Sequence, residues 1–105
     1  MSDISYEVIW GTDAELALLS HRKFIDTKSA YKNAISILSK RPSEQMEGIV
    51  DYPDYEFNGY CWAKINNAIV LYLVDHETKK VFIDGCESAM TGVALKYFFK
   101  EHDPL

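Results

Sequence analysis

The stretch between residues 60 and 86 constrains the fold of this chain more than any other segment. It holds three short apolar runs separated by two polar turns, at Asn66-Asn67 and at residues 76–79. Asparagine tolerates a positive φ better than most residues, so the first turn suits a two-residue hairpin. Residues 68–74 are almost continuously apolar, which is typical of a strand covered on both faces. The pattern therefore predicts an antiparallel meander of three strands with 68–74 at the centre of the sheet.

The N-terminal segment has the period of a strand. Large apolar side chains occupy every second position, at Ile4, Tyr6, Val8 and Trp10, and Gly11 follows them. Such alternation is expected of a strand that buries one face. We predict a strand that ends at Gly11.

Two helices are predicted between this strand and the meander. Thr12 and Glu15 have the spacing of a capping box, so a short helix is expected from Thr12 to about Ser20. Residues 27–39 carry apolar side chains three and four positions apart, which indicates a second helix that Pro42 stops.

The remaining segments are less regular. Residues 42–59 contain two prolines and two glycines, so they are expected to be mostly loop with one extended stretch. After the meander, an amphipathic helix is predicted from helical spacing of Met90, Val93, Ala94, Tyr97 and Phe98.

Size and composition predict a single domain that covers residues 1–105. Hydrophobic residues make up 48% of the chain and aromatic residues 13%, which is a globular mixture. The net charge of −5 argues against nucleic-acid binding by the surface as a whole. The N-terminus lacks the basic start of a signal peptide, and no apolar run is long enough to span a bilayer, so we expect a cytoplasmic protein without a membrane partner.

Charge is unevenly distributed along the chain. Between residues 22 and 41 there are six basic residues and one acidic residue, Asp26; the basic residues are Arg22, Lys23, Lys28, Lys32, Lys40 and Arg41. Residues 42–63 hold five acidic residues and no basic residue: Glu44, Glu47, Asp51, Asp54 and Glu56. One interpretation is that the basic group contacts phosphate while the acidic group gates it or faces a basic partner. The other is that the two groups compensate each other or are simply solvated.

Other residue types give weaker signals. The aromatic residues of the acidic segment are expected to pack in the core or in a protein interface, since neighbouring carboxylates would repel a nucleic-acid backbone; they are Tyr52, Tyr55, Phe57 and Tyr60. Cys61 and Cys86 fall in predicted strands and are interpreted as reduced core residues. The histidines at positions 21, 76 and 102 are far apart in sequence and are interpreted as surface residues. We expect no metal and no cofactor, because no phosphate-binding glycine loop and no metal-ligand spacing is present.

Taken together, these segments resemble the RelE/ParE toxin superfamily of bacterial toxin–antitoxin modules. The resemblance covers most of the chain and rests on patterns of residue class at 6–10, 37–42, 59–65, 68–75 and 80–86. It implies an α+β fold with an N-terminal strand, two helices, an antiparallel meander and a C-terminal helix. It also implies an antitoxin partner and, as targets, the ribosome with its bound mRNA, RNA or gyrase.

The resemblance also implies where an endoribonuclease of this family would carry its chemistry. Cations of the meander would hold the scissile phosphate, and residues after the last strand would transfer protons. On the middle strands, where the family tends to carry arginine, this chain has Cys61 and Ile69, so most of the usual catalytic residues are missing. Lys64 is left as the cation and Glu87 as a base. The six basic residues of 22–41 are the candidate substrate-binding group. The sequence therefore predicts a toxin-family protein that acts on a macromolecule, with Lys64 and Glu87 as candidate catalytic residues.

A second hypothesis comes from the acidic segment. In it the chain is a non-catalytic interaction or regulatory module that binds a basic protein partner through Glu44, Glu47, Asp51, Asp54 and Glu56. Overall acidity favours this hypothesis, whereas the basic group favours the first.

Overall fold

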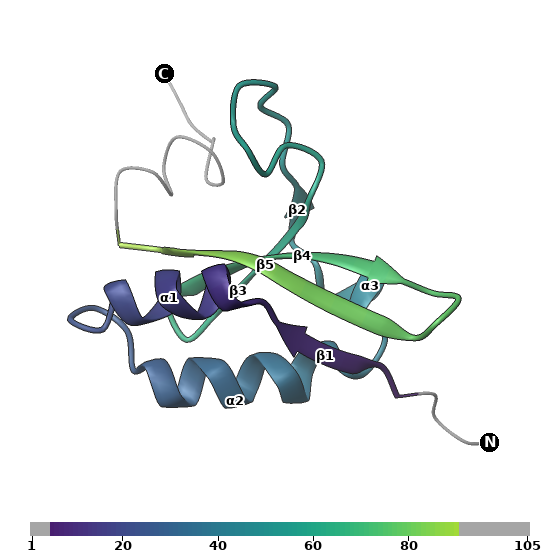
Figure 1. Ribbon diagram of the computed structural model, residues 1–105, viewed down its shortest axis with the longest axis horizontal. Helices are drawn as coiled ribbons and strands as arrows, with labels where there is room; N and C mark the ends of the chain where they lie inside the picture. The colour runs from purple at the N-terminus through teal and green to yellow at the C-terminus, as the bar shows by residue number, and fades with distance from the viewer. Residues whose placement is uncertain (1–4, 91–105) are drawn as a thin grey trace.

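The computed structural model describes residues 5–90. A five-stranded sheet has the strand order β1-β5-β4-β3-β2. Two longer helices cover one of its faces (Figure 1). The elements in chain order are β1 Glu7–Trp10, α1 Thr12–Ser20, α2 Thr27–Leu38, α3 Pro42–Gln45, β2 Gly48–Ile49, β3 Cys61–Ile65, β4 Ala68–Asp75 and β5 Lys80–Ser88.

The predicted meander is confirmed. Strands β3, β4 and β5 pair antiparallel in sequence order, and β4 lies at the centre of the sheet. Residues 68–72 of β4 are buried, as expected for a strand covered on both faces. Strand β1 pairs with β5 in the parallel direction, so the sheet is mixed. The α+β class predicted from the sequence is thus correct.

The hairpin between β3 and β4 has the predicted turn. Asn66 and Asn67 have φ values of 53° and 67°, as a two-residue turn between twisted strands requires. The side chain of Asn33 on α2 donates to Asn66 Oδ1 at 2.6 Å, so the turn is also fixed to the helix layer.

Helix α1 has the predicted bounds, Thr12–Ser20, but its N-terminal cap differs from the prediction. The capping box of Thr12 and Glu15 is wrong: Gly11 is the N-cap, and no side chain caps the helix. The physical reason is that the Gly11 N–H already bonds Ile83 O at 2.8 Å as the last contact of β1 with β5. This contact fixes the chain at Gly11, so that Thr12 is already the first helical residue.

Helix α2 agrees with the prediction to within one residue. It ends at Leu38, and its N-cap is Asp26, whose carboxylate accepts hydrogen bonds from the Ser29 N–H and the Ser29 hydroxyl. These bonds hold the pKa of Asp26 below its ordinary value. The one acid of the basic segment therefore serves to start the helix.

The segment after α2 is more regular than predicted. Helix α2 ends at Leu38, before Pro42, and Pro42 begins α3, where its missing N–H costs nothing. Arg41 joins the two helices with φ of 50°, and this sharp change of direction separates them. The extended stretch expected in 42–59 is β2, which pairs with Cys61 and Trp62 of β3.

Strand β5 is longer than the predicted 80–86, because it ends at Ser88. Its pairing with β4 shifts between Leu71 and Tyr72, where Leu71 faces Gly85 and Tyr72 faces Ile83. Asp84 is the extra residue of this bulge. Glu87 consequently lies inside the strand. The sequence predicts it after the strand.

Two apolar cores lie on opposite faces of the sheet. The larger core joins α1 and α2 to the sheet and includes Tyr72, Val81 and Ile83. The second core forms on the other face and contains Val50, Trp62, Ile69 and Leu71, against which Tyr52, Tyr55, Phe57 and Tyr60 pack. The prediction that these four aromatic residues serve packing is confirmed. Figure 1 shows the 50–60 segment on the side of the sheet away from α2.

The C-terminal helix predicted from Met90 to Phe98 lies almost entirely outside the described residues. Within residues 5–90, none of the helices has the length and apolar character needed to cross a bilayer.

Candidate functional site

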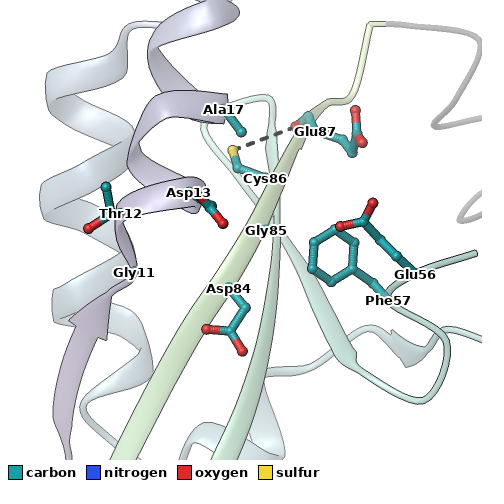
Figure 2. Close-up of a pocket in the computed structure, with 10 residues that line it drawn as sticks. All are labelled: Gly11, Thr12, Asp13, Ala17, Glu56, Phe57, Asp84, Gly85, Cys86 and Glu87. Atoms are coloured by element: carbon teal, nitrogen blue, oxygen red, sulfur yellow. Dashed lines mark hydrogen bonds between the residues drawn. The ribbon is translucent and has the colours of Figure 1, made fainter.

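A cleft of about 610 Å³ opens between α1, β5 and the 50–60 segment (Figure 2). Its lining residues come from three parts of the chain: Gly11, Thr12, Asp13 and Ala17 from the start of α1, Glu56 and Phe57 from the segment before β3, and Asp84, Gly85, Cys86 and Glu87 from β5.

The cleft exists because β1 is shorter than β5. The parallel pairing ends where Trp10 meets Ile83, and the chain then turns at Gly11 into α1, which lies along the remaining part of β5. On the other side the tip of the Phe57 ring rests on Gly85, where a Cβ would lie 2.4 Å from Phe57 Cζ. A glycine at position 85 is therefore required for the ring to reach the strand.

The lining of the cleft is acidic. Asp13, Glu56, Asp84 and Glu87 all contribute carboxylates, and none of the residues that line the cleft is a lysine or an arginine. The hydroxyl of Tyr60 donates to Asp84 Oδ2 at 2.9 Å. Burial and then this carboxylate raise the pKa of Tyr60. Clustered carboxylates that no lysine or arginine among the described lining residues compensates create a negative potential that attracts cations and repels phosphate.

Glu87 has two polar neighbours in this wall. Its Oε1 lies 3.9 Å from Nε2 of His21, and its Oε2 accepts a hydrogen bond from the Tyr55 hydroxyl at 3.3 Å. Only 24% of the Glu87 side chain is exposed. Burial raises the pKa of Glu87 and the charge of Glu56 raises it further, whereas His21 and Tyr55 act to lower it. Glu87 therefore contacts an imidazole and a phenol, which are group types that acid–base catalysis uses.

The structure places the two candidate catalytic residues on one sheet face. Lys64 lies opposite Ile69, and Ile69 lies opposite Glu87, so the three residues form one row across β3, β4 and β5. Two strand spacings separate the backbones of Lys64 and Glu87 by about 10 Å. The Lys64 side chain is exposed and does not line the cleft. Lys64 and Glu87 thus share a face of the sheet but do not share a pocket.

The six basic residues do not form one patch. Arg22 and Lys23 follow α1, Lys28 and Lys32 lie on α2, and Lys40 and Arg41 follow α2. Helix α2 has 12 residues. At about 1.5 Å per residue it separates the first pair from the last by about 18 Å. The predicted substrate-binding group is therefore dispersed over α2 and the segments that flank its two ends.

The five acidic residues of the predicted partner surface also separate. Glu44 pairs with Arg41 at 3.7 Å, which is the kind of local compensation that the second charge interpretation expects. The Glu47 carboxylate accepts the backbone N–H of Lys64 at 2.8 Å. Glu56 lines the cleft, and Asp51 and Asp54 are exposed in the loop. Glu56 alone among the five joins the acidic cleft.

The histidines and cysteines have more specific settings than the sequence indicated. His21 is half-buried, with 21% of its side chain exposed, and lies beside Glu87. His76 is exposed, and its ring nitrogens contact the hydroxyls of Tyr6 and Ser43 at 2.7 and 3.1 Å. Both cysteines are free; Cys86 is buried, and Cys61 is half-buried. Burial raises the pKa of the Cys86 thiol to about 12, and the Glu87 charge adds to this effect. His102 lies outside the described residues.

The sequence did not identify Asp13, His21, Tyr55 or Asp84 as site residues. They lie in four separate segments, and contact across the sheet brings them together. One local signal was present: Asp84-Gly85 interrupts an apolar strand pattern, and such an interruption is typical of a bulge beside a functional site. In residues 5–90 no group of three or more His, Cys, Asp or Glu side chains is arranged to hold a metal ion.

Comparison with known proteins gives a likeness of fold. No protein-family model matches the chain, and no curated protein matches it. Among solved structures, it is similar to a chain in the crystal structure of the toxin–antitoxin complex RelBE2 from Mycobacterium tuberculosis. The TM-score is 0.63 with 22% identity, and the alignment covers 83% of this chain and 97% of that chain. At this identity the likeness concerns the fold, and the RelE-like α+β fold expected from the sequence is confirmed.

Proposed function

We propose that this chain is the toxin-like member of a toxin–antitoxin pair and that it acts by binding a protein target through the acidic cleft. The observation that carries the proposal is the likeness of fold, which extends over 97% of a chain from a toxin–antitoxin complex. The sequence resemblance to RelE/ParE toxins supports the toxin half of such a pair.

The chemistry of the cleft supports a protein target over an RNA target. The four carboxylates, with no lysine or arginine beside them among the lining residues of the described part of the chain, would oppose the approach of phosphate. The same carboxylates suit the guanidinium of arginine, which can bind a carboxylate through two parallel hydrogen bonds. Phe57 lines the cleft as well, and aromatic rings attract such cations. The ligand that fits is a protein segment with exposed arginine or lysine side chains.

A test is to induce the chain in bacteria without a partner and to measure growth, bulk mRNA integrity and the amount of protein. We expect growth arrest with intact mRNA, and recovery of growth when Asp84→Asn and Glu87→Gln are combined. Glu77→Gln is the matched control, because Glu77 is exposed in the turn before β5 and does not line the cleft. Normal growth at full protein level would contradict the proposal. Gyrase and the ribosome are the first targets to assay in extracts.

RNA cleavage is the second candidate, and one observation favours it. His21 and Tyr55 both contact Glu87, which lies on the sheet face that carries Lys64. Cleavage by the neighbouring 2′-hydroxyl needs a base, a proton donor and charge stabilisation at phosphate. Fragmented mRNA that becomes intact with His21→Ala would select this candidate over binding alone.

A non-toxic interaction module, the second hypothesis from the sequence, would use the same cleft. Growth of the induced cells distinguishes it from a toxin. In that case the chain would bind an arginine-rich peptide, the binding would weaken with Asp84→Asn and Glu87→Gln, and cells would grow normally.

A further inference from the structure

Polar side chains from three segments meet at the end of the molecule that carries α3. The imidazole of His76, in the turn between β4 and β5, contacts the Ser43 hydroxyl through Nε2 at 3.1 Å and the Tyr6 hydroxyl through Nδ1 at 2.7 Å. Figure 1 shows α3, this turn and the start of β1 at one end of the molecule, and the turn between α1 and α2 at the other. Ser43, His76 and Tyr6 do not line the acidic cleft, so they form a separate polar cluster.

The sequence before Ser43 is strongly basic. Lys40 and Arg41 stand three and two positions before Ser43, and no other serine or threonine of the chain has a lysine or arginine at either of these positions. Ser43 and both basic residues are exposed. A protein kinase with an acidic substrate groove selects serines by such a charge pattern, because the groove attracts the basic side chains. Ser43 is therefore the hydroxyl of this chain that such an enzyme would choose.

The backbone around Ser43 can open locally. Helix α3 has four residues, Pro42–Gln45, and a helix of one turn is not stable by itself. It is held by hydrogen bonds from outside its own ladder, among them those from the Tyr72 hydroxyl to Pro42 O at 3.0 Å and from Gln45 Nε2 to Lys40 O at 3.2 Å. Release of this single turn is sufficient to present Ser43 in the extended form that an enzyme groove can bind.

We propose that Ser43 is a phosphorylation site for a serine kinase with an acidic substrate groove, and that the phosphate then binds the imidazole of His76. The γ-phosphoryl group of ATP passes to Ser43 Oγ: the Oγ–P bond forms, the bond between the γ-phosphorus and the oxygen of ADP breaks, and the hydroxyl proton goes to the base of the kinase. Ser43 lies outside the acidic cleft, so its phosphorylation does not depend on the function assigned to the cleft.

The surroundings of Ser43 suit a phosphate group. Phosphoserine carries a charge between about −1.5 and −2 near neutral pH and offers three strong acceptor oxygens. His76 already lies within hydrogen-bond reach of Ser43 Oγ, and the neighbouring carboxylate of Glu44 already faces Arg41 at 3.7 Å. A phosphate on Ser43 would therefore join α3 to the turn between β4 and β5 by a charge-assisted hydrogen bond, which is stronger than the contact of the unmodified hydroxyl.

The test uses the full chain, ATP labelled on its γ-phosphate and the purified catalytic domain of a serine kinase that prefers basic residues before its serine. We expect label on Ser43, located by mass spectrometry of proteolytic fragments, and loss of this label in Ser43→Ala. Ser36→Ala is the matched control and should leave the label unchanged. Ser36 is exposed on α2, and asparagine and alanine stand three and two positions before it.

A second variant tests the recognition of positive charge. Lys40→Gln combined with Arg41→Asn removes both charges, and asparagine tolerates the positive φ of position 41. The rate of labelling should fall by at least about tenfold. Lys28→Gln removes an exposed lysine of α2 instead and should leave the rate unchanged.

The contact between the phosphate and His76 is measured by thermal unfolding at low ionic strength, where exposed charge pairs are little screened. Phosphorylation should raise Tm by about 2–4 °C. In His76→Ala, phosphorylation should leave Tm unchanged. The comparison is made within each variant, so any loss of stability from the substitution itself cancels.

Three results would overturn the proposal. The first is absence of label from Ser43 in the full chain, which would mean that the fold or the sequence withholds this serine from the kinase. The second is an equal rate of labelling in wild type and in Lys40→Gln, Arg41→Asn. The third is a Tm that phosphorylation leaves unchanged in wild type, or raises equally in His76→Ala, because the phosphate then does not bind the imidazole.

Discussion

The carboxylate of Glu87 lies 3.9 Å from Nε2 of His21, although the two residues are 66 positions apart in the sequence. His21 is held at the end of α1, where its backbone N–H bonds Leu18 O, and Glu87 is held in β5. The packing of α1 along the part of β5 that β1 leaves free creates this contact. The same packing forms the wall of the acidic cleft.

The first prediction concerns the effect of Glu87 on stability as pH changes. Burial raises the pKa of Glu87, with a further increase from Glu56, against the opposing effects of His21 and Tyr55. A carboxyl group whose pKa is higher in the folded state stabilises the fold most when protonated, so its contribution is lost as pH rises through that pKa. Glu87→Gln should therefore raise Tm near neutral pH and have little effect at low pH.

The measurement is thermal unfolding of wild type and Glu87→Gln from about pH 4 to about pH 8, a range that covers ordinary carboxyl and histidine titration. The Tm difference between Glu87→Gln and wild type should grow with pH. Glu77→Gln, at an exposed residue, should show no such trend. A constant difference across the range would mean that Glu87 titrates as it does in the unfolded chain.

The second prediction concerns the contact between Gly85 and Phe57. A methyl group at position 85 would lie within 2.9 Å of three atoms of the Phe57 ring, so the ring must leave β5. Gly85→Ala should lower the free energy of unfolding by about 1–3 kcal/mol, as overpacking usually does. In Phe57→Ala the obstacle is absent, so adding Gly85→Ala to it should cost less than adding it to wild type. Denaturant unfolding of wild type, the two single variants and the double variant gives the cost of Gly85→Ala with and without the Phe57 ring. Equal costs in the two backgrounds would contradict the contact.

The sequence was sufficient for the elements whose pattern is local. Asn66-Asn67 encodes a turn of positive φ, and the apolar run of residues 68–74 encodes a covered central strand. The α2 periodicity likewise fixed that helix to within one residue. In these cases a physical requirement of neighbouring residues decides the structure.

The site was less predictable because its geometry depends on contacts between distant segments. Thr12 has the sequence of an N-cap, but the chain is fixed by the bond from Gly11 to Ile83, and Gly11 takes the N-cap position instead. His21 has no acidic neighbour in sequence, and only the docking of α1 on β5 gives it Glu87. The acidic cleft likewise combines Asp13, Glu56 and Asp84 from three segments, so no single window of sequence contains it.

The third prediction concerns the turn between β3 and β4. Asn67 has φ of 67°, a conformation that β-branched residues tolerate poorly. Asn67→Val should lower the free energy of unfolding by about 1–2 kcal/mol. Asn67→Gly should cost far less, because glycine adopts this conformation freely. Glu77→Val supplies the control for adding a β-branched residue to an exposed turn position, since Glu77 is not among the described residues with positive φ. Equal losses for both valine variants would contradict the argument.

The fourth prediction concerns the edge of the sheet, where Glu47 takes the place of a longer β2. Strand β2 pairs with Cys61 and Trp62 only, and beyond it the Glu47 carboxylate accepts the Lys64 N–H at 2.8 Å. Glu47→Ala removes this acceptor and should lower the free energy of unfolding by about 1 kcal/mol. Hydrogen exchange of the Lys64 amide, followed by NMR, should accelerate by about fivefold to tenfold. Glu47→Gln retains a side-chain carbonyl and should preserve most of the protection. Unchanged exchange in Glu47→Ala would show that the edge of β3 is protected by other means.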